Sequence, residues 1–108
     1  MNRGEVWTVA GGVYSSKPRP AVIIQDDAFS ETNSVTVAPM TTTLLDAPLL
    51  RLRVMTIAEA GVASDSDVMV DKITTVRRSH VGQKLGRLTN EQMVELERLL
   101  MTFLGMAR

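Results

Sequence analysis

The sequence contains no cysteine and only one histidine, His80, among its 108 residues. The lack of cysteine excludes disulfide bonds, thiolate metal sites and a cysteine nucleophile. One histidine is too few for a mechanism that uses a histidine pair as acid and base, and a residue such as His80 is more often an exposed turn residue. Phosphate-binding loop, serine-elbow, HExxH and dinucleotide-binding motifs are also missing. Any catalysis must therefore depend on other side chains.

Aromatic residues and net charge are also scarce. The four aromatic residues are too few for a long base-stacking platform; they are Trp7, Tyr14, Phe29 and Phe103. Twelve basic and twelve acidic side chains give a formal net charge of zero, so no global field attracts a polyanion. Binding to nucleic acid would require a local patch that covers few bases.

No apolar run is long enough to span a bilayer, and the N-terminal MNRGEVW has no apolar signal core. We therefore expect a cytoplasmic protein that has no membrane partner. The length predicts one domain over residues 1–108, since this chain has no material for a second core. The carboxylates Asp65, Asp67 and Asp71 match no calcium-loop spacing, so we expect neither a metal ion nor another cofactor.

Short strand-like segments dominate and are separated by Gly, Pro, Ser, Asp and Asn clusters. They cover residues 5–9, 21–25, 35–38, 50–55, 68–73 and 83–88. The segment VIIQ is apolar without alternation, as in a strand covered on both faces, whereas Arg51 and Arg53 alternate with apolar residues. The Gly and Ser pairs of residues 10–18 predict a mobile loop. The pattern indicates a mainly β protein with α (α+β), built as a small antiparallel barrel.

The C-terminal segment has the pattern of a helix. Thr89 and Gln92 have the spacing of a capping box, and Gly105 stands where a C-cap is expected. Apolar residues follow at helical spacing between them, at Met93, Leu96, Leu100 and Leu104. The sequence therefore predicts a helix after the last strand, and shorter helical turns near residues 27–31 and 77–80.

The most informative local feature is Arg19, which stands between Pro18 and Pro20. The two prolines restrict the backbone, so the guanidinium leaves a stiff platform and can hold a phosphate through two parallel hydrogen bonds. A single arginine beside proline is usually a surface residue. However, the threonine run 41–43 follows a strand that we expect to pair beside residues 21–25, which would bring hydroxyl groups near Arg19.

Two other polar positions are candidates for function. Asp71 lies within the otherwise apolar VMVDKI, where an unpaired carboxylate is costly to bury. Asp71 is either part of a structural ion pair or a functional carboxylate that accepts a proton or positions a cation. Gln25 precedes Asp26 and Asp27 at the end of a strand; helix capping explains one aspartate, and the Gln25 amide is a candidate for reading a base.

Four segments in this order resemble the MazF/PemK toxins of type II toxin–antitoxin systems. They are RGEVWTV, KPRPAVIIQDD, VTVAPMTTT and VMVDKITTV. The resemblance covers nearly the whole chain. It implies a small SH3-like barrel related to CcdB that forms a homodimer. It also implies a metal-independent, sequence-specific endoribonuclease that cuts single-stranded RNA and is restrained by a cognate antitoxin.

Carried onto this sequence, the family's catalytic arginine falls on Arg19 and its catalytic threonine on Thr41. The PemK branch adds an arginine and an aspartate two positions later; here the aspartate is Asp71, but Met69 replaces the arginine. The family's first-loop histidine has no counterpart. We expect further RNA contacts from residues of the first loop and of two strands, which are Tyr14, Ser15, Ser16, Lys17, Gln25, Arg51 and Arg53.

The expected chemistry is attack of the ribose 2′-hydroxyl on the adjacent phosphorus, which yields a 2′,3′-cyclic phosphate and a free 5′-hydroxyl. Arg19 and the Thr41 hydroxyl would stabilise the phosphoryl oxygens, and Asp71 is the candidate base. Two alternatives remain. One is a CcdB-like inhibitor of DNA gyrase, but that branch uses a tryptophan near its C-terminus, whereas this chain has only Trp7. The other is an inactive barrel that acts as a binding partner.

Overall fold

The computed structural model describes residues 1–11, 15–55 and 61–106, with the backbone alone at Ser15 and Ser16. These residues form seven strands, three short 3-10 helices and one α-helix. The strands are β1 (Glu5–Gly11), β2 (Ser15–Ile23), β3 (Ser34–Thr41), β4 (Arg51–Val54), β5 (Ser66–Met69), β6 (Thr74–Arg77) and β7 (Val81–Arg87). The helices are η1 (Asp27–Phe29), η2 (Val70–Lys72), η3 (Arg78–His80) and α1 (Asn90–Phe103).

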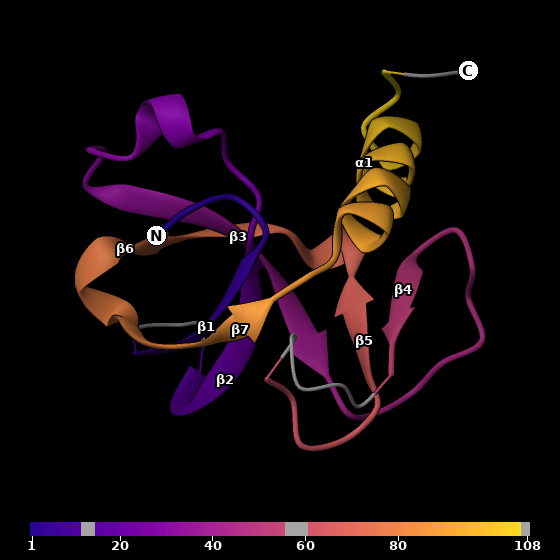
Figure 1. Cartoon of the computed structure of the whole chain (residues 1–108), viewed down its shortest axis with the longest axis horizontal. Helices are drawn as coiled ribbons and strands as arrows, with labels where there is room; N and C mark the ends of the chain where they lie inside the picture. Colours follow the sequence, from indigo (N-terminus) through magenta and orange to yellow (C-terminus); the bar gives the residue numbers. More distant parts are fainter. Residues whose placement is uncertain (12–14, 56–60, 107–108) are drawn as a thin grey trace.

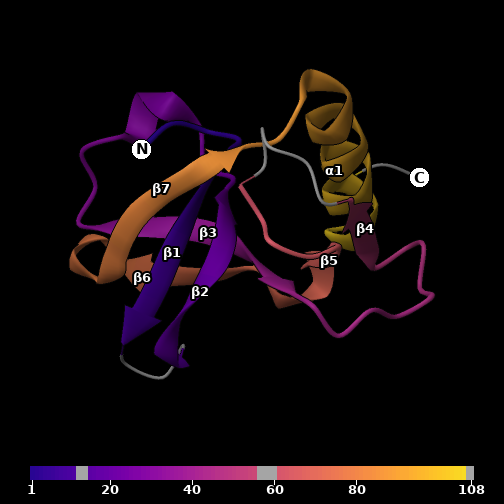
Figure 2. The same cartoon turned by 60° about the horizontal axis from the view of Figure 1, so that its bottom comes forward.

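The strands form one antiparallel sheet in the order β4-β5-β3-β2-β1-β7, and β6 also pairs with β3. Figures 1 and 2 show β1, β2, β3, β6 and β7 curled together on one side, with β4, β5 and α1 on the other. The predicted class, mainly β with a C-terminal helix, is confirmed. Among the described residues, however, the pairings follow an open, curled path and do not close into a ring.

Two apolar cores lie on opposite faces of β2. Val22 belongs to the core beneath α1, together with Leu96 and Leu100, whereas Ala21 and Ile23 belong to the second core inside the curl of the sheet. All three β2 residues are almost completely buried. The prediction that VIIQ is covered on both faces is thus confirmed for its first two residues, and this burial holds the start of the strand, with Arg19, in a fixed register.

The expected continuous strand over residues 68–73 is wrong, because η2 interrupts it. Met40 of β3 faces Val68 of β5, and Val37 of β3 faces Thr74 of β6. Two residues separate the two pairing positions on β3. Five residues, 69–73, separate their partners on the segment that runs from β5 to β6. The three additional residues have no place in the ladder and fold into the turn η2.

The β1–β2 hairpin extends farther than the sequence predicted. The expected loop 10–18 is mostly strand, since Val9 pairs with Arg19 and Gly11 pairs with Ser15. Gly11 has a positive φ of 94°, and a Cβ added there would lie 3.1 Å from the ring of His80, so glycine serves both the turn and a close contact. His80 is accordingly a half-buried packing residue.

The C-terminal helix is as predicted. The Thr89 hydroxyl accepts the Gln92 N–H, and the Gln92 side chain accepts the Thr89 N–H, which completes the capping box. Gly105 follows with a positive φ of 73°. The helix packs Leu96, Leu99 and Leu100 into the first core. No helix in the described ranges is long and apolar enough to cross a membrane.

Candidate active site

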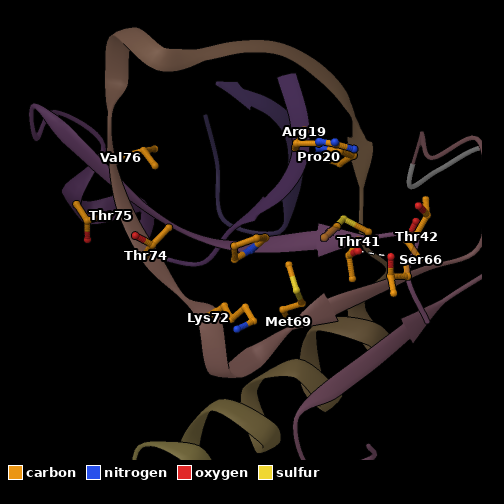
Figure 3. Close-up of a pocket in the computed structure, with 13 residues that line it drawn as sticks. Arg19, Pro20, Thr41, Thr42, Ser66, Met69, Lys72, Thr74, Thr75 and Val76 are labelled. Atoms are coloured by element: carbon orange, nitrogen blue, oxygen red, sulfur yellow. Dashed lines mark hydrogen bonds between the residues drawn. The ribbon is translucent and has the colours of Figure 1, made fainter. Parts of the chain in front are cut away.

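A hollow of about 560 Å³ opens where β3 changes its neighbour from β6 to β5. Pro39 lies at this change and has no N–H to donate to a neighbouring strand. Figure 3 shows side chains from β2, β3, η2 and β6 gathered around the space. The lining residues are Arg19, Pro20, Pro39, Met40, Thr41, Thr42, Thr43, Ser66, Met69, Lys72, Thr74, Thr75 and Val76.

Among the described residues, the charged lining of the hollow consists of two cations, Arg19 and Lys72, without a carboxylate. Both side chains are exposed. Among the described residues, no Asp or Glu lies within ion-pairing distance of either one. The two positive charges are therefore available to an anionic ligand, and the guanidinium of Arg19 can hold two oxygens of a phosphate.

Thr41 ends β3 at the rim of this hollow, so the expected meeting of Arg19 with the threonine run is observed. Its Oγ1 accepts a hydrogen bond of 3.1 Å from the backbone N–H of Thr43, drawn as a dashed line in Figure 3. Because the hydroxyl oxygen acts as the acceptor in this bond, its own proton remains available to donate to a ligand.

Beside the hollow, the strands β4 and β5 carry a buried ion-pair cluster. The completely buried carboxylate of Asp67 accepts from Arg53 Nε at 2.5 Å, from Arg51 Nη1 at 3.4 Å and from the Leu45 N–H at 2.9 Å. Burial alone would raise the pKa of Asp67, but these donors outweigh it and lower the pKa. Arg51 and Arg53, expected to contact RNA, thus point into this cluster instead of into the hollow.

Comparison with known proteins agrees with this geometry. Residues 2–104 match the PemK-like, MazF-like toxin of type II toxin–antitoxin systems. The chain is also 49% identical, over 99% of both sequences, to a protein of Mycolicibacterium smegmatis (strain ATCC 700084 / mc(2)155) described as a probable endoribonuclease MazF. The chain belongs to the PemK/MazF-like toxin family.

Solved structures of other proteins have the same fold as this PemK/MazF-like chain. An endoribonuclease from a mycobacterial species, solved with its cognate antitoxin, superposes with a TM-score of 0.83 at 24% identity and covers 100% of this chain and 98% of its own. The Mycobacterium tuberculosis toxin MazF-mt6 gives 0.81 at 23% identity, with 98% and 100% covered. A MazE–MazF complex from Deinococcus radiodurans gives 0.76 at 20% identity, with 99% and 97% covered.

Asp71, the PemK-like aspartate, lies in η2 and not in a strand. Its residue is half-buried, and its Oδ1 is buried without a hydrogen-bond partner among the described residues. Met69 at the end of β5 and Lys72 at the end of η2 line the hollow, whereas Asp71 does not. In this conformation the carboxylate does not reach the space between Arg19 and Thr41, so its role as base stays a prediction.

The other residues expected to contact RNA lie apart from the hollow or outside the described parts. The Gln25 amide donates to the Phe29 carbonyl at 3.0 Å and accepts from the Thr36 N–H at 2.9 Å, so it holds the segment after β2 in place. Lys17 is exposed on β2. Tyr14 and the side chains of Ser15 and Ser16 lie outside the described residues.

Sequence reasoning missed the contribution of η2 and β6 to the hollow. Lys72 supplies its second cation, and Ser66, Thr74 and Thr75 supply further hydroxyl groups. The Thr-Thr pair after DKI repeats the hydroxyl pattern of residues 41–43 and was the available signal. Lys72 gave no such signal, because only the turn at η2 brings it to the hollow.

Proposed function

We propose that this PemK/MazF-like chain is a toxin that cleaves single-stranded RNA at specific sequences as an endoribonuclease, without a metal ion. The observation that carries the proposal is the hollow itself, where Arg19 and Thr41 meet beside Lys72 and the part of the chain that the structure describes contributes no carboxylate. A phosphodiester is an anion that this set of donors suits. The Mycolicibacterium relative, described as a probable endoribonuclease, supports the same assignment.

In the proposed reaction the ribose 2′-hydroxyl attacks the adjacent phosphorus, and the bond from phosphorus to the 5′-oxygen breaks. The leaving 5′-oxygen takes up a proton from solvent water, assisted by Arg19, so the products are a 2′,3′-cyclic phosphate and a free 5′-hydroxyl. Arg19 binds the nonbridging oxygens and stabilises the charge that builds up on them. The Thr41 hydroxyl donates its free proton to one of these oxygens, since the Thr43 N–H already occupies its acceptor side. Lys72 adds positive charge on the same side of the scaffold and binds a neighbouring phosphate.

The proton of the 2′-hydroxyl requires an acceptor, and Asp71 is the proposed one. Its Oδ1 accepts no hydrogen bond from the described residues, so none of them competes there for the role of proton donor. Because Asp71 does not line the hollow, its side chain must turn toward it once RNA is bound. The adjacent Lys72 would then lie beside the newly protonated group.

The proposed partners are a cognate antitoxin and a second copy of the chain, within the cytoplasm. A structural relative solved with its cognate antitoxin supports the first of these. Exposed apolar side chains along α1 and just after it are suited to a dimer contact. They are Val94, Met101, Phe103, Leu104 and Met106.

The test is incubation of the purified protein with a pool of single-stranded RNA in the presence of a chelator, followed by sequencing of the cut ends. We expect cleavage at a short recognition sequence, cyclic-phosphate ends and no cleavage of the matching DNA, which lacks the nucleophile. Arg19→Ala and Thr41→Ala should each lower the cleavage rate strongly and leave a residual rate that single-turnover assays can measure. Arg98→Ala is the matched control, since Arg98 lies exposed on α1 and, within the described ranges, forms its ion pair with Glu95 alone.

Two results would overturn the proposal. Equal survival of the RNA with wild type and with both variants would remove the nuclease assignment, and cleavage that appears only after magnesium is added would remove the metal-free mechanism. A gyrase supercoiling assay in parallel examines the CcdB-like alternative. Inhibition of gyrase by a protein that leaves RNA intact would establish that alternative.

A further inference from the structure

A continuous chain of hydrogen bonds joins the buried ion-pair cluster to the Thr41 hydroxyl. One guanidinium nitrogen of Arg51, Nη1, donates to Asp67 Oδ2 at 3.4 Å and to the backbone carbonyl of Thr43 at 3.2 Å. The N–H of the same Thr43 donates to Thr41 Oγ1. The chain therefore passes from a carboxylate, through an arginine and one residue of backbone, to the group proposed to contact phosphate.

The turn after β3 is held at a second point as well. The Leu45 N–H donates over 2.9 Å to the same carboxylate oxygen as Arg51, Asp67 Oδ2. Thr41 itself pairs with Asp67 in the β3–β5 register. The segment from Thr41 to Leu45 is thus tied to Asp67 by a strand pairing, by the Arg51 bridge and by the Leu45 N–H, although most of its side chains are exposed.

The two arginines that share this carboxylate differ in how far their side chains are buried. The side chain of Arg51 is 14% exposed, whereas that of Arg53 is 43% exposed. Arg51 has little surface left for RNA, and its guanidinium faces both Asp67 and Thr43. Arg53 bonds to Asp67 more closely but has no hydrogen bond to the turn among the described residues.

We propose that Arg51, anchored by Asp67, positions the Thr41 hydroxyl through the backbone of Thr43. Arg51 is then a positioning residue that does not touch the RNA, and this role replaces the RNA contact expected from the sequence. The inference rests on the proposed ribonuclease function. It extends that function, because it explains how a threonine at the end of a strand keeps its acceptor side occupied and its proton free for the substrate.

The experiment compares Arg51→Ala with Arg53→Ala, in the wild-type background and in Thr41→Ala. Both variants remove one arginine from Asp67, but only Arg51→Ala removes the bond to Thr43. We expect Arg51→Ala to lower kcat about tenfold or more with KM within about twofold, and Arg53→Ala to lower kcat about threefold or less. Arg51→Lys, which keeps a donor, should recover part of the loss.

The Thr41→Ala background identifies the route of the effect. If Arg51 acts through Thr41, then Arg51→Ala has no further effect once the hydroxyl is absent. An equal loss in both backgrounds, or a loss confined to KM with a weaker salt dependence, would show a direct RNA contact and overturn the inference. Equal kcat values for Arg51→Ala and Arg53→Ala would also overturn it.

The amide resonance of Thr43 supplies a readout that needs no activity. Its shift reports the bond to Thr41 Oγ1, so Arg51→Ala and Thr41→Val should both move it, and Arg53→Ala should move it less. An unmoved resonance in folded Arg51→Ala protein contradicts the positioning role. If wild type itself cleaves no RNA, the proposed function fails, whereas the resonance still decides whether Arg51 orients the turn.

Discussion

Two pairs of cations flank Thr41, and they differ in what they contact. Arg51 and Arg53 bond to the buried Asp67, whereas Arg19 and Lys72 have no ion-pair partner among the described residues. The first pair belongs to the scaffold, because its charge is matched where it stands. The second pair borders the hollow and can bind an anion. In a chain of zero formal net charge, this sorting of cations creates the local patch.

The Thr41 hydroxyl and the Arg19 guanidinium are positioned in different ways. Asp67 holds the turn that follows Thr41, and the Thr43 N–H of this turn bonds to the Thr41 hydroxyl and orients it. Arg19 is placed by the β1–β2 hairpin instead, where it pairs with Val9 in the backbone register while its side chain reaches solvent. A site of this kind combines a held hydroxyl with an unoccupied guanidinium. Substitutions on the two sides should therefore act on different measurable quantities.

The largest expected effect is on the unpaired side. Arg19→Ala should lower the single-turnover cleavage rate by about a hundred- to a thousandfold, since it removes a donor to the developing phosphoryl charge. Its folding free energy should stay close to that of wild type, because the side chain has no ion-pair partner to lose among the described residues. Arg19→Lys should restore little of the rate, as lysine lacks the planar fork. A rate unchanged in Arg19→Ala contradicts the comparison.

The paired side should respond in stability. Asp67→Ala leaves two arginines facing an empty buried position and should lower the free energy of unfolding by about 2 to 4 kcal/mol, measured by urea denaturation. Asp67→Asn, which keeps the acceptor for the Leu45 N–H, should cost less. Lys72→Ala is the matched control with an expected change within about 0.5 kcal/mol. Equal losses for Asp67→Ala and Lys72→Ala would remove the distinction between the pairs.

Glu5 extends the comparison to a second engaged carboxylate. Burial would raise its pKa, but the Asn2 N–H, the Trp7 indole and Lys84 together lower it from 4.5 to about 2. The lowered pKa makes Glu5 stabilise the fold above pH 4.5, and this contribution is lost as the pH falls toward 2.

The loss from Glu5 amounts to at most about 3.5 kcal/mol, since one pKa unit corresponds to about 1.4 kcal/mol. Urea denaturation between pH 5 and pH 2 should therefore show a steeper fall in wild type than in Glu5→Gln, with both chains unfolded reversibly. Parallel curves for the two proteins would show that the carboxylate is not held by its donors.

The smallest effect is expected from Lys72→Ala. Loss of one phosphate contact should weaken binding of a 2′-deoxy-substituted oligonucleotide several-fold and reduce the slope of log affinity against log salt by about 0.7. Lys72→Arg should preserve the slope, because it keeps the charge. A slope that does not change in Lys72→Ala places this lysine outside the RNA path.

Much of the fold was predictable because local patterns determine it. The capping box of Thr89 and Gln92 and the helical spacing of Leu96 and Leu100 specify α1 without reference to the rest of the chain. The doubly apolar strand that ends at Ile23 is covered on both faces. The prediction of a continuous strand over 68–73 was wrong. This segment has three residues more than the part of β3 that it faces, and that difference follows from the registers of the β3–β5 and β3–β6 pairs, which the sequence does not reveal.

The candidate site was predictable to a similar degree. Arg19 and Thr41 were paired from strand order alone, and they line the same hollow. The sequence did not reveal that Arg51 and Arg53 bond to a buried carboxylate. A strand in which arginines alternate with apolar residues has the same sequence pattern whether the arginines face solvent or a buried aspartate. Asp67, fourteen residues beyond Arg53, decides between the two.

The sequence by itself determined the chemistry available to this protein: an arginine held between prolines, a threonine run, no thiol, one histidine and balanced charge. It also determined the capped helix and most strands, since side-chain periodicity and capping are local properties. Only the tertiary structure decided which cations stay available for an anion. Charge pairing depends on distances of a few ångströms between residues far apart in the chain, and these distances arise from strand register.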